Sequence, residues 1–351
     1  MPKYFIDLER LKYPNNGLYQ FDLHLANELL KQINSDEELE LYLPERAKTL
    51  IDKSVNTRFV NYYAWHKVFS PKSNADVWHI TQQGSYFQPS NEQTKCLLTI
   101  HDLNFLYTTK SDKAKASLLK RVQKKVDRAD HIVCISNFIK ADVQKYLNVT
   151  DKPITVVYNG YSLNAYNENC IIPYRPQSEF LFTIGAIHPK KNLHVLPALL
   201  LNNNYQLIIS GTGNENYKNE IVANAKKIGV EDRLIFIGNV SEDQKVWYYK
   251  TCKAFLFPSL SEGFGIPVIE AFSLGKPVFL SNRTCLPEIG STHAYYFEDF
   301  EPEYMRKVFE ENIANANDKV LVQNRINYAH TFSWQKMASN YLKLYRLLAA
   351  R

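Results

Sequence analysis

Two glutamates, Glu262 and Glu270, lie eight positions apart in the segment "SEGFGIPVIE". Gly263 and Gly265 stand between them, and no lysine or arginine does. Glycine lets the backbone take unusual dihedral angles and approach a ligand closely. Pro267 is typical of the first turn of a helix, and a helix N-terminus binds anions through unpaired N–H groups and its dipole. The segment therefore predicts an anion site that needs no basic side chain and has a carboxylate on either side.

The two carboxylates could also bind the hydroxyl groups of a sugar. A carboxylate accepts hydrogen bonds from paired sugar hydroxyls, as in the ribose contact of dinucleotide-binding folds. One glutamate on a ribose, phosphates on the backbone amides and the other glutamate on a second sugar would match a nucleotide sugar laid along this loop. The plain alternative is that Glu262 completes a Ser-x-x-Glu capping box with Ser259, and that Glu270 is a solvated helix residue.

Short apolar runs alternate with helix-length amphipathic segments along the whole chain, which predicts an α/β fold with parallel sheets and crossover helices. The strands are expected at 3–9, 38–44, 57–63, 76–81, 95–103, 131–136, 154–160, 180–187, 205–210, 234–240, 254–259, 277–282 and 294–299. The helices are expected at 18–33, 113–129, 137–147 and 266–275, among others.

A polar segment, residues 161–179, interrupts this alternation and carries Pro173 and Pro176, so it is interpreted as a linker. A chain of 351 residues is long enough for two domains with separate cores. We therefore expect an N-terminal domain over 1–165 and a C-terminal domain over 175–333. Ligands of such sheets bind at the carboxyl ends of the strands.

The composition sets limits on partners and compartment. A net charge of +6 suits an acidic small substrate or an anionic membrane surface and does not call for nucleic acid. Five scattered cysteines without a CxxC pair, and a beginning unlike a signal peptide, predict a cytoplasmic protein with reduced thiols. The nine histidines form no metal-ligand pattern with nearby carboxylates, so no metal site is expected.

The string "SEGFGIPVIEA", followed by "GKPVFLSNRTCLPEIG", resembles the E-x7-E signature of the retaining family 4 glycosyltransferases, which have the GT-B fold. The similarity extends over nearly the whole chain, through "NNGLYQFDLHLANELL", "TIHDLNFLY", "ADHIVCISNFIKADV", "GAIHPKKNL" and "FSWQKMASNYLKLY" in that order. The resemblance implies two Rossmann-like, doubly wound domains facing a central cleft. It also implies that the last helix, 334–351, crosses back to the first domain.

Residue roles follow from the same resemblance. Glu270 would bind the ribose, Glu262 the transferred sugar, and Lys191 with Lys190 would neutralise the leaving diphosphate. The catalytic residues implied are Glu262, His101 and Lys191. The donor-binding residues implied are Lys190, Gly185, Gly263, Phe264, Gly265, Ile266, Glu270 and Val240, and an acceptor or diphosphate loop would contain Gly17 and Tyr19. Many relatives carry an arginine where this chain has Ala186, and a lysine at 190 supplies charge without bidentate geometry. A lone histidine such as His101 is otherwise more often a structural residue.

The activity implied is transfer of a hexose, with retention, from a nucleoside diphosphate donor to a glycan or lipid-linked saccharide in bacterial surface polysaccharide synthesis. GDP-mannose is the first expected donor and a UDP-hexose the second, with no metal or cofactor. The same fold also allows a sugar phosphorylase, an epimerase or a catalytically degenerate nucleotide-sugar-binding subunit. Gly211 and Gly213 after a strand hint at a nicotinamide cofactor, although a tight turn explains them better.

A basic helix is expected near the middle of the N-terminal domain, with eight lysines and arginines between Lys110 and Arg128. Such a helix could dock on anionic lipid at the inner face of the cytoplasmic membrane, where a lipid-linked acceptor would lie. The alternative is an ordinary solvated face.

Overall fold

The computed structural model describes residues 1–14, 16–52, 56–68, 70–108 and 110–350. The chain forms two compact units, of which the first comprises 1–160 with 333–351 and the second 161–332. The expected linker thus belongs to the second unit, where Asn164 donates a hydrogen bond to Asp243 (2.8 Å) and Tyr248 donates one to the Tyr174 carbonyl (2.7 Å). Within the described residues, we find no helix that combines the length and the apolar character needed to span a membrane.

The first unit is built on a sheet of seven parallel strands in the order β3-β2-β1-β4-β5-β6-β7. The strands are β1 (Lys3–Asp7), β2 (Glu38–Leu43), β3 (Thr57–Asn61), β4 (Val77–Ile80), β5 (Lys95–Ile100), β6 (His131–Cys134) and β7 (Ile154–Val156). All seven expected strands are confirmed, and each ends about one to four residues before the end of its predicted run. Their near-continuous apolar sequence is typical of parallel strands covered on both faces.

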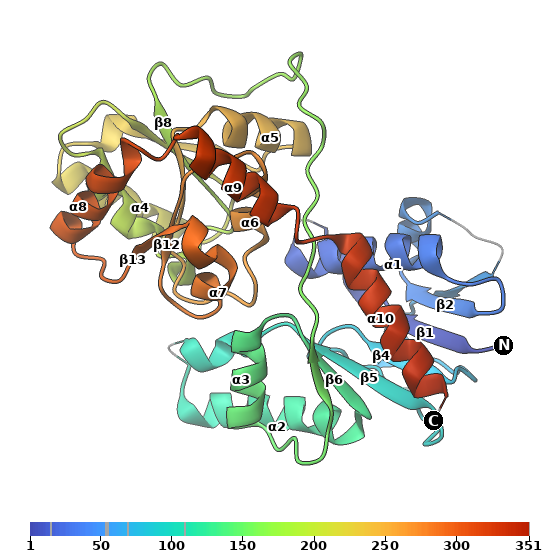
Figure 1. The fold of residues 1–351 in the computed structure, drawn as a ribbon. Helices are drawn as coiled ribbons and strands as arrows, with labels where there is room; N and C mark the ends of the chain where they lie inside the picture. Colours follow the sequence, from blue (N-terminus) through green and yellow to red (C-terminus); the bar gives the residue numbers. More distant parts are fainter. Residues whose placement is uncertain (15, 53–55, 69, 109, 351) are drawn as a thin grey trace. The chain divides into compact units, whose positions relative to one another are not determined.

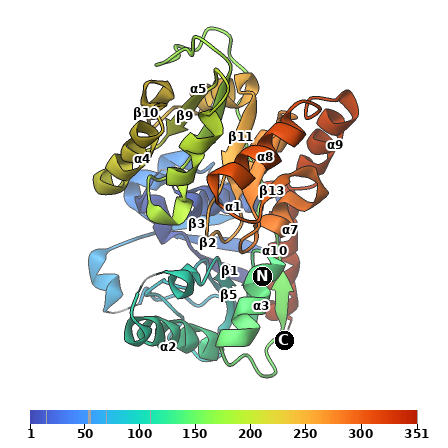
Figure 2. The ribbon, with the colours of Figure 1, turned by 90° about the vertical axis from the view of Figure 1, so that its left-hand side faces the viewer.

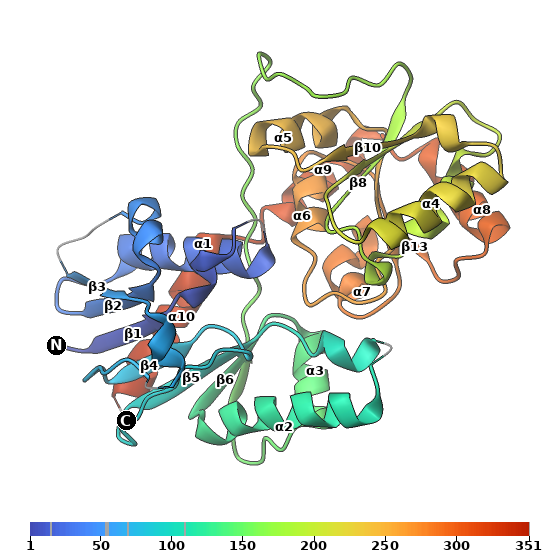
Figure 3. The same ribbon diagram turned by 180° about the vertical axis from the view of Figure 1, so that it is seen from behind.

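Four α-helices accompany this sheet: α1 (Gly17–Gln32), α2 (Asp112–Arg128), α3 (Asn137–Tyr146) and α10 (Trp334–Ala349). The last helix lies beside α1 (Figure 1), and the hydroxyl groups of Tyr341 and Tyr345 reach Thr99 (2.9 Å) and His79 (2.7 Å) on the buried strands. Helices α2 and α3 pack near β5 and β6 (Figure 3). Sequence patterns did not predict the short 3-10 helices η1 (Glu9–Lys12), η2 (Glu45–Leu50), η3 (Ala64–Lys67) and η4 (Asn104–Tyr107).

The second unit has a six-stranded parallel sheet in the order β10-β9-β8-β11-β12-β13. Its strands are β8 (Phe180–Ile184), β9 (Gln206–Ser210), β10 (Leu234–Gly238), β11 (Ala254–Phe257), β12 (Val278–Ser281) and β13 (Tyr295–Phe297), and all were expected. Its helices are η5 (Pro189–Lys191), η6 (Leu193–Leu200), α4 (Glu215–Lys227), η7 (Glu231–Arg233), α5 (Glu242–Thr251), α6 (Ile266–Ser273), α7 (Leu286–Gly290), η8 (Ser291–His293), α8 (Pro302–Ile313) and α9 (Lys319–Ala329).

Alternate side chains of the second sheet pack on opposite layers. On one face, Ile209 and Phe279 join Tyr217 of α4 and Phe309 of α8 in a buried cluster. Figure 2 shows these two helices beside the strands of this unit. On the other face, Phe182 contacts the rings of Tyr248 and Tyr249 on α5, while α9 packs against α6. Because all strands are parallel, the loops that follow β8, β11 and β12 meet at one edge of the sheet. This edge is where the second unit can bind a ligand.

Candidate active site

The loop between β11 and α6 contains the pair of glutamates. Gly265 precedes the helix with a φ of 106°, in the left-handed region that favours glycine, and no side chain caps the helix N-terminus. Pro267 lies in the first turn, as the sequence predicted. Pro267 has no N–H and the Val268 N–H donates to the Gly265 carbonyl (3.0 Å), so the first-turn amide that can meet an anion is that of Ile266.

The capping-box interpretation of Glu262 is wrong. The residue at the N-cap of α6 is Gly265, six positions after Ser259. The hydroxyl of Ser259 is buried and has no hydrogen-bond partner within the described chain. The backbone N–H of Glu262 donates instead to the Thr284 hydroxyl (3.1 Å), in the loop after β12. The carboxylate of Glu262 is therefore free of a capping role.

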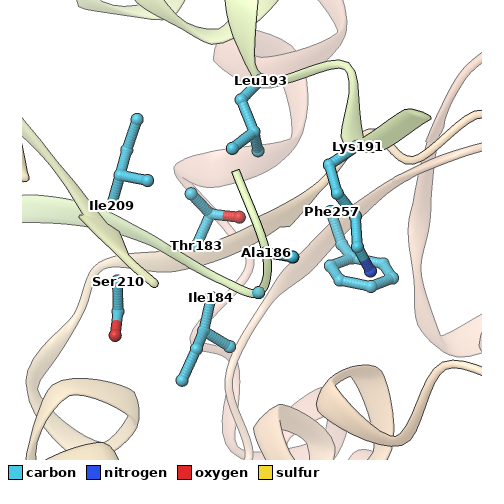
Figure 4. Close-up of a pocket in the computed structure, with 9 residues that line it drawn as sticks. Thr183, Ile184, Ala186, Lys191, Leu193, Ile209, Ser210 and Phe257 are labelled. Carbon is cyan, nitrogen blue, oxygen red and sulfur yellow. The ribbon is translucent and has the colours of Figure 1, made fainter. Parts of the chain in front are cut away.

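The side chain of Glu262 forms an ion pair with Lys191. The Lys191 Nζ donates to Glu262 Oε1 at 2.5 Å, and the two side chains are only 14% and 13% exposed. The same ammonium group lies 4.7 Å from the centre of the Phe257 ring (Figure 4), where a cation is attracted to the aromatic face. A cation and a carboxylate are thus held together beside the N-terminus of α6.

The turn that presents Lys191 follows strand β8. Gly185 directly follows the strand with a φ of 142°, and the Lys191 side chain passes over it, 3.5 Å from where a Cβ would stand. His188 accepts a hydrogen bond from the Lys190 N–H (3.2 Å), and Asn192 takes the left-handed conformation with a φ of 56°. These features make one 3-10 turn that points Lys191 toward the site. Lys190 forms no ion pair with any described residue, and its carbonyl accepts from the Leu260 N–H (2.8 Å).

A small pocket opens beside this turn at the edge of the sheet (Figure 4). Its lining residues come from β8, β9, β11 and the turn: Thr183, Ile184, Gly185, Ala186, Lys191, Leu193, Ile209, Ser210 and Phe257. Ala186 is exposed and contributes only a methyl group to this lining. The cationic group of this pocket is therefore Lys191.

The glycines of "IISGTGNEN" serve packing. A Cβ on Gly211 would stand 2.0 Å from the Gly185 carbonyl oxygen, and one on Gly213 would stand 2.3 Å from that of Ile187. Only glycine fits at such close backbone approaches. Asn214 then caps α4 by accepting from the Tyr217 N–H (3.0 Å). The tight-turn interpretation of this motif is confirmed.

The second glutamate, Glu270, is buried, so its interpretation as a solvated helix residue is wrong. It is 5% exposed and lies on α6 facing α5. Lys245 donates to its Oε1 at 2.7 Å, and the Tyr249 hydroxyl donates to its Oε2 at 2.9 Å. Each carboxylate oxygen accepts up to two hydrogen bonds, so both retain capacity for a ligand.

The charges around Glu270 reinforce one another. Burial alone would lower the pKa of Lys245, but the carboxylates of Glu270 and Glu242 outweigh it and raise this pKa above its usual value. Burial and the nearby Glu270 charge raise the pKa of Tyr249 well above its usual value. At neutral pH Lys245 is therefore a cation and Tyr249 a neutral donor. Both donors hold the carboxyl group of Glu270 in place.

Some residues of the site were missed by the sequence analysis. Lys245 and Tyr249 are one helical turn apart on α5, a spacing that places them on one face. Thr284 and Cys285, from the loop after β12, hold the glutamate loop: the buried Cys285 thiol contacts the carbonyls of Glu262 (3.3 Å) and Phe264 (3.2 Å). The i, i+4 spacing was a visible signal, but nothing in the sequence indicated that it faces Glu270.

The remaining donor-side residue, Val240, lies between β10 and the Ser241 N-cap of α5. The chain turns there at Gly238, whose φ is 68° and whose carbonyl accepts from the Gly211 N–H (2.7 Å). Val240 is half-buried. It therefore lies at the start of the helix that carries Lys245 and Tyr249.

The first unit holds the other predicted residues. His101 follows the carboxyl end of β5, with its Nε2 2.8 Å from the Thr81 carbonyl and its ring against the edge of Phe21. Burial lowers the pKa of His101 to about 4, so the ring is neutral at pH 7. Gly17 begins α1, and the Tyr19 N–H donates to the Asn16 side chain (2.9 Å) at the helix N-cap. Asn15 of the same predicted loop lies outside the described residues.

No group of three or more histidines, cysteines or carboxylates that could hold a metal ion occurs among the residues that the structure describes. The cations near the two glutamates are the lysines named above. The arrangement can therefore offer hydroxyl-accepting carboxylates, a helix N-terminus without a side-chain cap and the Lys191 ammonium group to an anionic ligand with sugar hydroxyls.

Comparison with known families agrees with this chemistry. Residues 172–319 match the family described as glycosyl transferases group 1. Residues 34–165 match the family described as Glycosyltransferase Family 4. The two matches together extend over most of both units.

Curated relatives point in the same direction. The O-antigen chain mannosyltransferase RfbU of Salmonella typhimurium is 26% identical over 242 residues, which are 68% of this chain and 66% of that protein. The serotype-specific mannosyltransferase WbdA of Escherichia coli is 29% identical over 60% of this chain, which spans only 28% of that longer protein. The O-antigen chain mannosyltransferase B of Escherichia coli is 22% identical over 97% of this chain and 98% of its own.

Solved structures share the fold. Sucrose-phosphate synthase from Thermosynechococcus elongatus superposes with a TM-score of 0.77 over 100% of both chains, at 17% identity. The Anabaena protein HepE, solved in complex with UDP, gives a TM-score of 0.71 over 98% of this chain and 99% of its own, at 14% identity. At such identities the likeness establishes the architecture alone, and it is that of two-domain GT-B proteins.

Proposed function

Because the chain belongs to the family 4 glycosyltransferases of the GT-B fold, we propose that it transfers a hexose from a nucleoside diphosphate donor to a saccharide or lipid-linked acceptor in bacterial surface polysaccharide synthesis. The observation that carries this proposal is the Lys191–Glu262 pair beside the uncapped N-terminus of α6. Mannose from GDP-mannose is the first candidate, since the curated relatives named above are mannosyltransferases. A UDP-hexose is the second.

The proposed donor lies along the α6 loop. Its diphosphate accepts from the amides at Phe264, Gly265 and Ile266, and the helix dipole favours its charge. Glu270 accepts from the ribose hydroxyls, and the base lies near Val240. Lys190 adds a second positive charge at the rim of this site.

Transfer of the sugar requires Lys191 to exchange its ion-pair partner. When a diphosphate enters, the ammonium group turns from Glu262 to the phosphate oxygens, and Glu262 is released to accept hydroxyl groups of the transferred sugar. The leaving diphosphate gains negative charge as the glycosidic bond stretches, so Lys191 stabilises the transition state more than the ground state. Retention follows if the departing phosphate oxygen takes the acceptor proton on the same face of the sugar.

The first unit is proposed to bind the acceptor around Gly17 and Tyr19. Neutral His101 would donate or accept a hydrogen bond at the donor sugar without adding charge. In this proposal the lysines and the helix amides stabilise the negative charge of the diphosphate, so no metal or cofactor is needed.

The proposal is tested by thermal stabilisation of the purified protein with GDP, UDP, ADP and NAD in the presence of EDTA. A ligand that binds the folded state raises the melting temperature. We expect a shift with GDP or UDP and none with NAD. A shift only with NAD would contradict the donor site, and no shift with GDP or UDP would favour a chain that has lost nucleotide-sugar binding.

We also propose that the protein docks on anionic membrane at the cytoplasmic face through α2. Lys113, Lys120 and Lys124 are exposed on this helix, whereas Lys125 and Arg128 donate to carbonyls of the neighbouring segment 87–94. Flotation with vesicles of phosphatidylglycerol, compared with phosphatidylcholine alone, tests the contact. We expect binding to the anionic vesicles that is lost with Lys120→Gln and Lys124→Gln together. Equal binding to both vesicles would contradict it.

A further inference from the structure

Helix α5 presents a lysine and a tyrosine to Glu270, and nothing in the E-x7-E signature requires either. Lys245 and Tyr249 lie one turn apart on the face of α5 that packs on α6. Each donates to a different oxygen of the carboxylate, at 2.7 and 2.9 Å. The carboxyl group is thus fixed at both oxygens by one rigid element.

The surroundings make this arrangement rigid. Tyr249 is fully buried, with its ring at right angles to Phe182 (5.3 Å between centroids) and against Phe255 (5.1 Å). Lys245 is 12% exposed and also pairs with Glu242 (2.8 Å) at the start of α5. Side chains held by packing and by paired charges lose little further freedom when a ligand arrives. The free lone pairs of Glu270 therefore point in fixed directions before any nucleotide binds.

We propose that Lys245 and Tyr249 are positioning residues that make the site selective for a ribose over a deoxyribose. The proposal rests on the proposed function, in which Glu270 faces the ribose hydroxyls. A carboxylate with one donor already on each oxygen has room for one hydroxyl at each, which matches the adjacent 2′ and 3′ hydroxyls of a ribose. A sugar lacking a hydroxyl would leave a desolvated carboxylate oxygen short of a donor, which costs affinity.

The experiment compares the affinity of the native protein for GDP and UDP with that for their 2′-deoxy and 3′-deoxy analogues, by calorimetry. We expect the better nucleotide to bind about 10- to 100-fold more tightly than its deoxy analogues, the range for a hydrogen bond to a charged group. Tyr249→Phe removes one donor, and Lys245→Met removes the other with its charge. Each substitution should reduce the ribose-to-deoxyribose ratio by about 5- to 10-fold.

Two control variants separate positioning from general damage. Tyr248→Phe removes a buried tyrosine hydroxyl on the same helix that donates to the Tyr174 carbonyl. Lys276→Met removes a half-buried lysine that donates to the Cys252 carbonyl (3.0 Å). Both controls should keep the native ratio even if overall affinity or melting temperature falls. Because the readout is a ratio, a modest loss of folded protein does not alter it.

The outcomes distinguish this inference from the proposed function. If GDP and UDP both fail to bind, the proposed donor site and the inference fall together. If one binds but the native protein does not discriminate against deoxyribose, the donor site stands and the ribose selectivity is overturned. If the native protein discriminates and Tyr249→Phe and Lys245→Met keep the full ratio, the positioning role is overturned.

Discussion

The two glutamates of the signature have opposite surroundings. Glu262 lies on a loop and is held by one lysine from a 3-10 turn, with the pair near the edge of the second sheet. Glu270 lies on a helix, and two side chains of a neighbouring helix donate to it in a buried layer. A single ion pair can exchange partners when a ligand enters, whereas the buried set is fixed beforehand. Glu262 is therefore suited to a contact that changes when a ligand binds, and Glu270 to a contact with the ligand that stays the same throughout.

The largest expected effect comes from Glu262→Gln. Loss of a contact to the transferred sugar that strengthens as the sugar departs should lower turnover by about 100- to 1,000-fold, the range for one preorganised group. It also frees Lys191, so the affinity for GDP or UDP alone should stay equal or rise. Release of nucleoside diphosphate from the sugar donor measures the first, and calorimetry the second. Native turnover in Glu262→Gln would contradict the role of this residue.

Glu270→Gln should have a smaller effect on catalysis and act on binding. The amide keeps the size of the side chain but loses the charge that pairs with Lys245, so we expect the donor KM to rise by about 10- to 100-fold while kcat changes little. Steady-state kinetics at saturating donor separate the two constants. If Glu270→Gln lowered kcat alone, the two glutamates would have the same role in catalysis. That result would contradict the separate binding role of Glu270.

The strands and the α6 region were predictable because parallel, buried strands have apolar sequences that are easily recognised. Pro267 and the glycines indicated the helix start for the same local reasons. The partners of the glutamates were not predictable. Lys191 and Glu262 are 71 positions apart, and Lys245 and Glu270 are 25 apart on different helices. Which of these distant side chains meet depends on how the helices and strands pack against one another. A single sequence does not show that packing.

The burial of Glu270 was missed for a related reason. A glutamate in a helix is most often exposed, because burying a carboxylate costs free energy unless other groups pair with it or donate hydrogen bonds to it. Those partners lie on α5, whose sequence "EDQKVWYYK" shows the spacing without showing the contact. The 3-10 helices were missed because they are short and their patterns are weak.

The smallest expected effect concerns the first unit, where neutral His101 contrasts with the charged groups of the second. Its pKa is about 4 in the folded chain and about 6.5 when unfolded, so the unfolded state takes up a proton first as the pH falls. The stability that native protein derives from this residue is therefore present above pH 6.5 and is lost toward pH 4.

Replacement by His101→Gln measures that contribution. Urea unfolding at pH 7 and pH 5 should show the native protein losing about 2 kcal/mol more than the variant over this interval. Exposed His330 offers a matched control variant, His330→Gln, which removes an imidazole from the surface instead of from the interior. An identical loss in native protein and His101→Gln would show that this ring does not titrate as a buried group.

Retaining transfer without a metal is tested most directly by proton NMR. The measurement follows the slow hydrolysis of GDP-mannose or a UDP-hexose by the native protein, with EDTA present and water as the acceptor. We expect the first hexose released to keep the anomeric configuration of the donor, and Glu262→Gln to slow the release by about 100- to 1,000-fold. Release of the inverted anomer first, or release that needs a divalent metal, would contradict a retaining transfer carried by Lys191, Glu262 and the amides of α6.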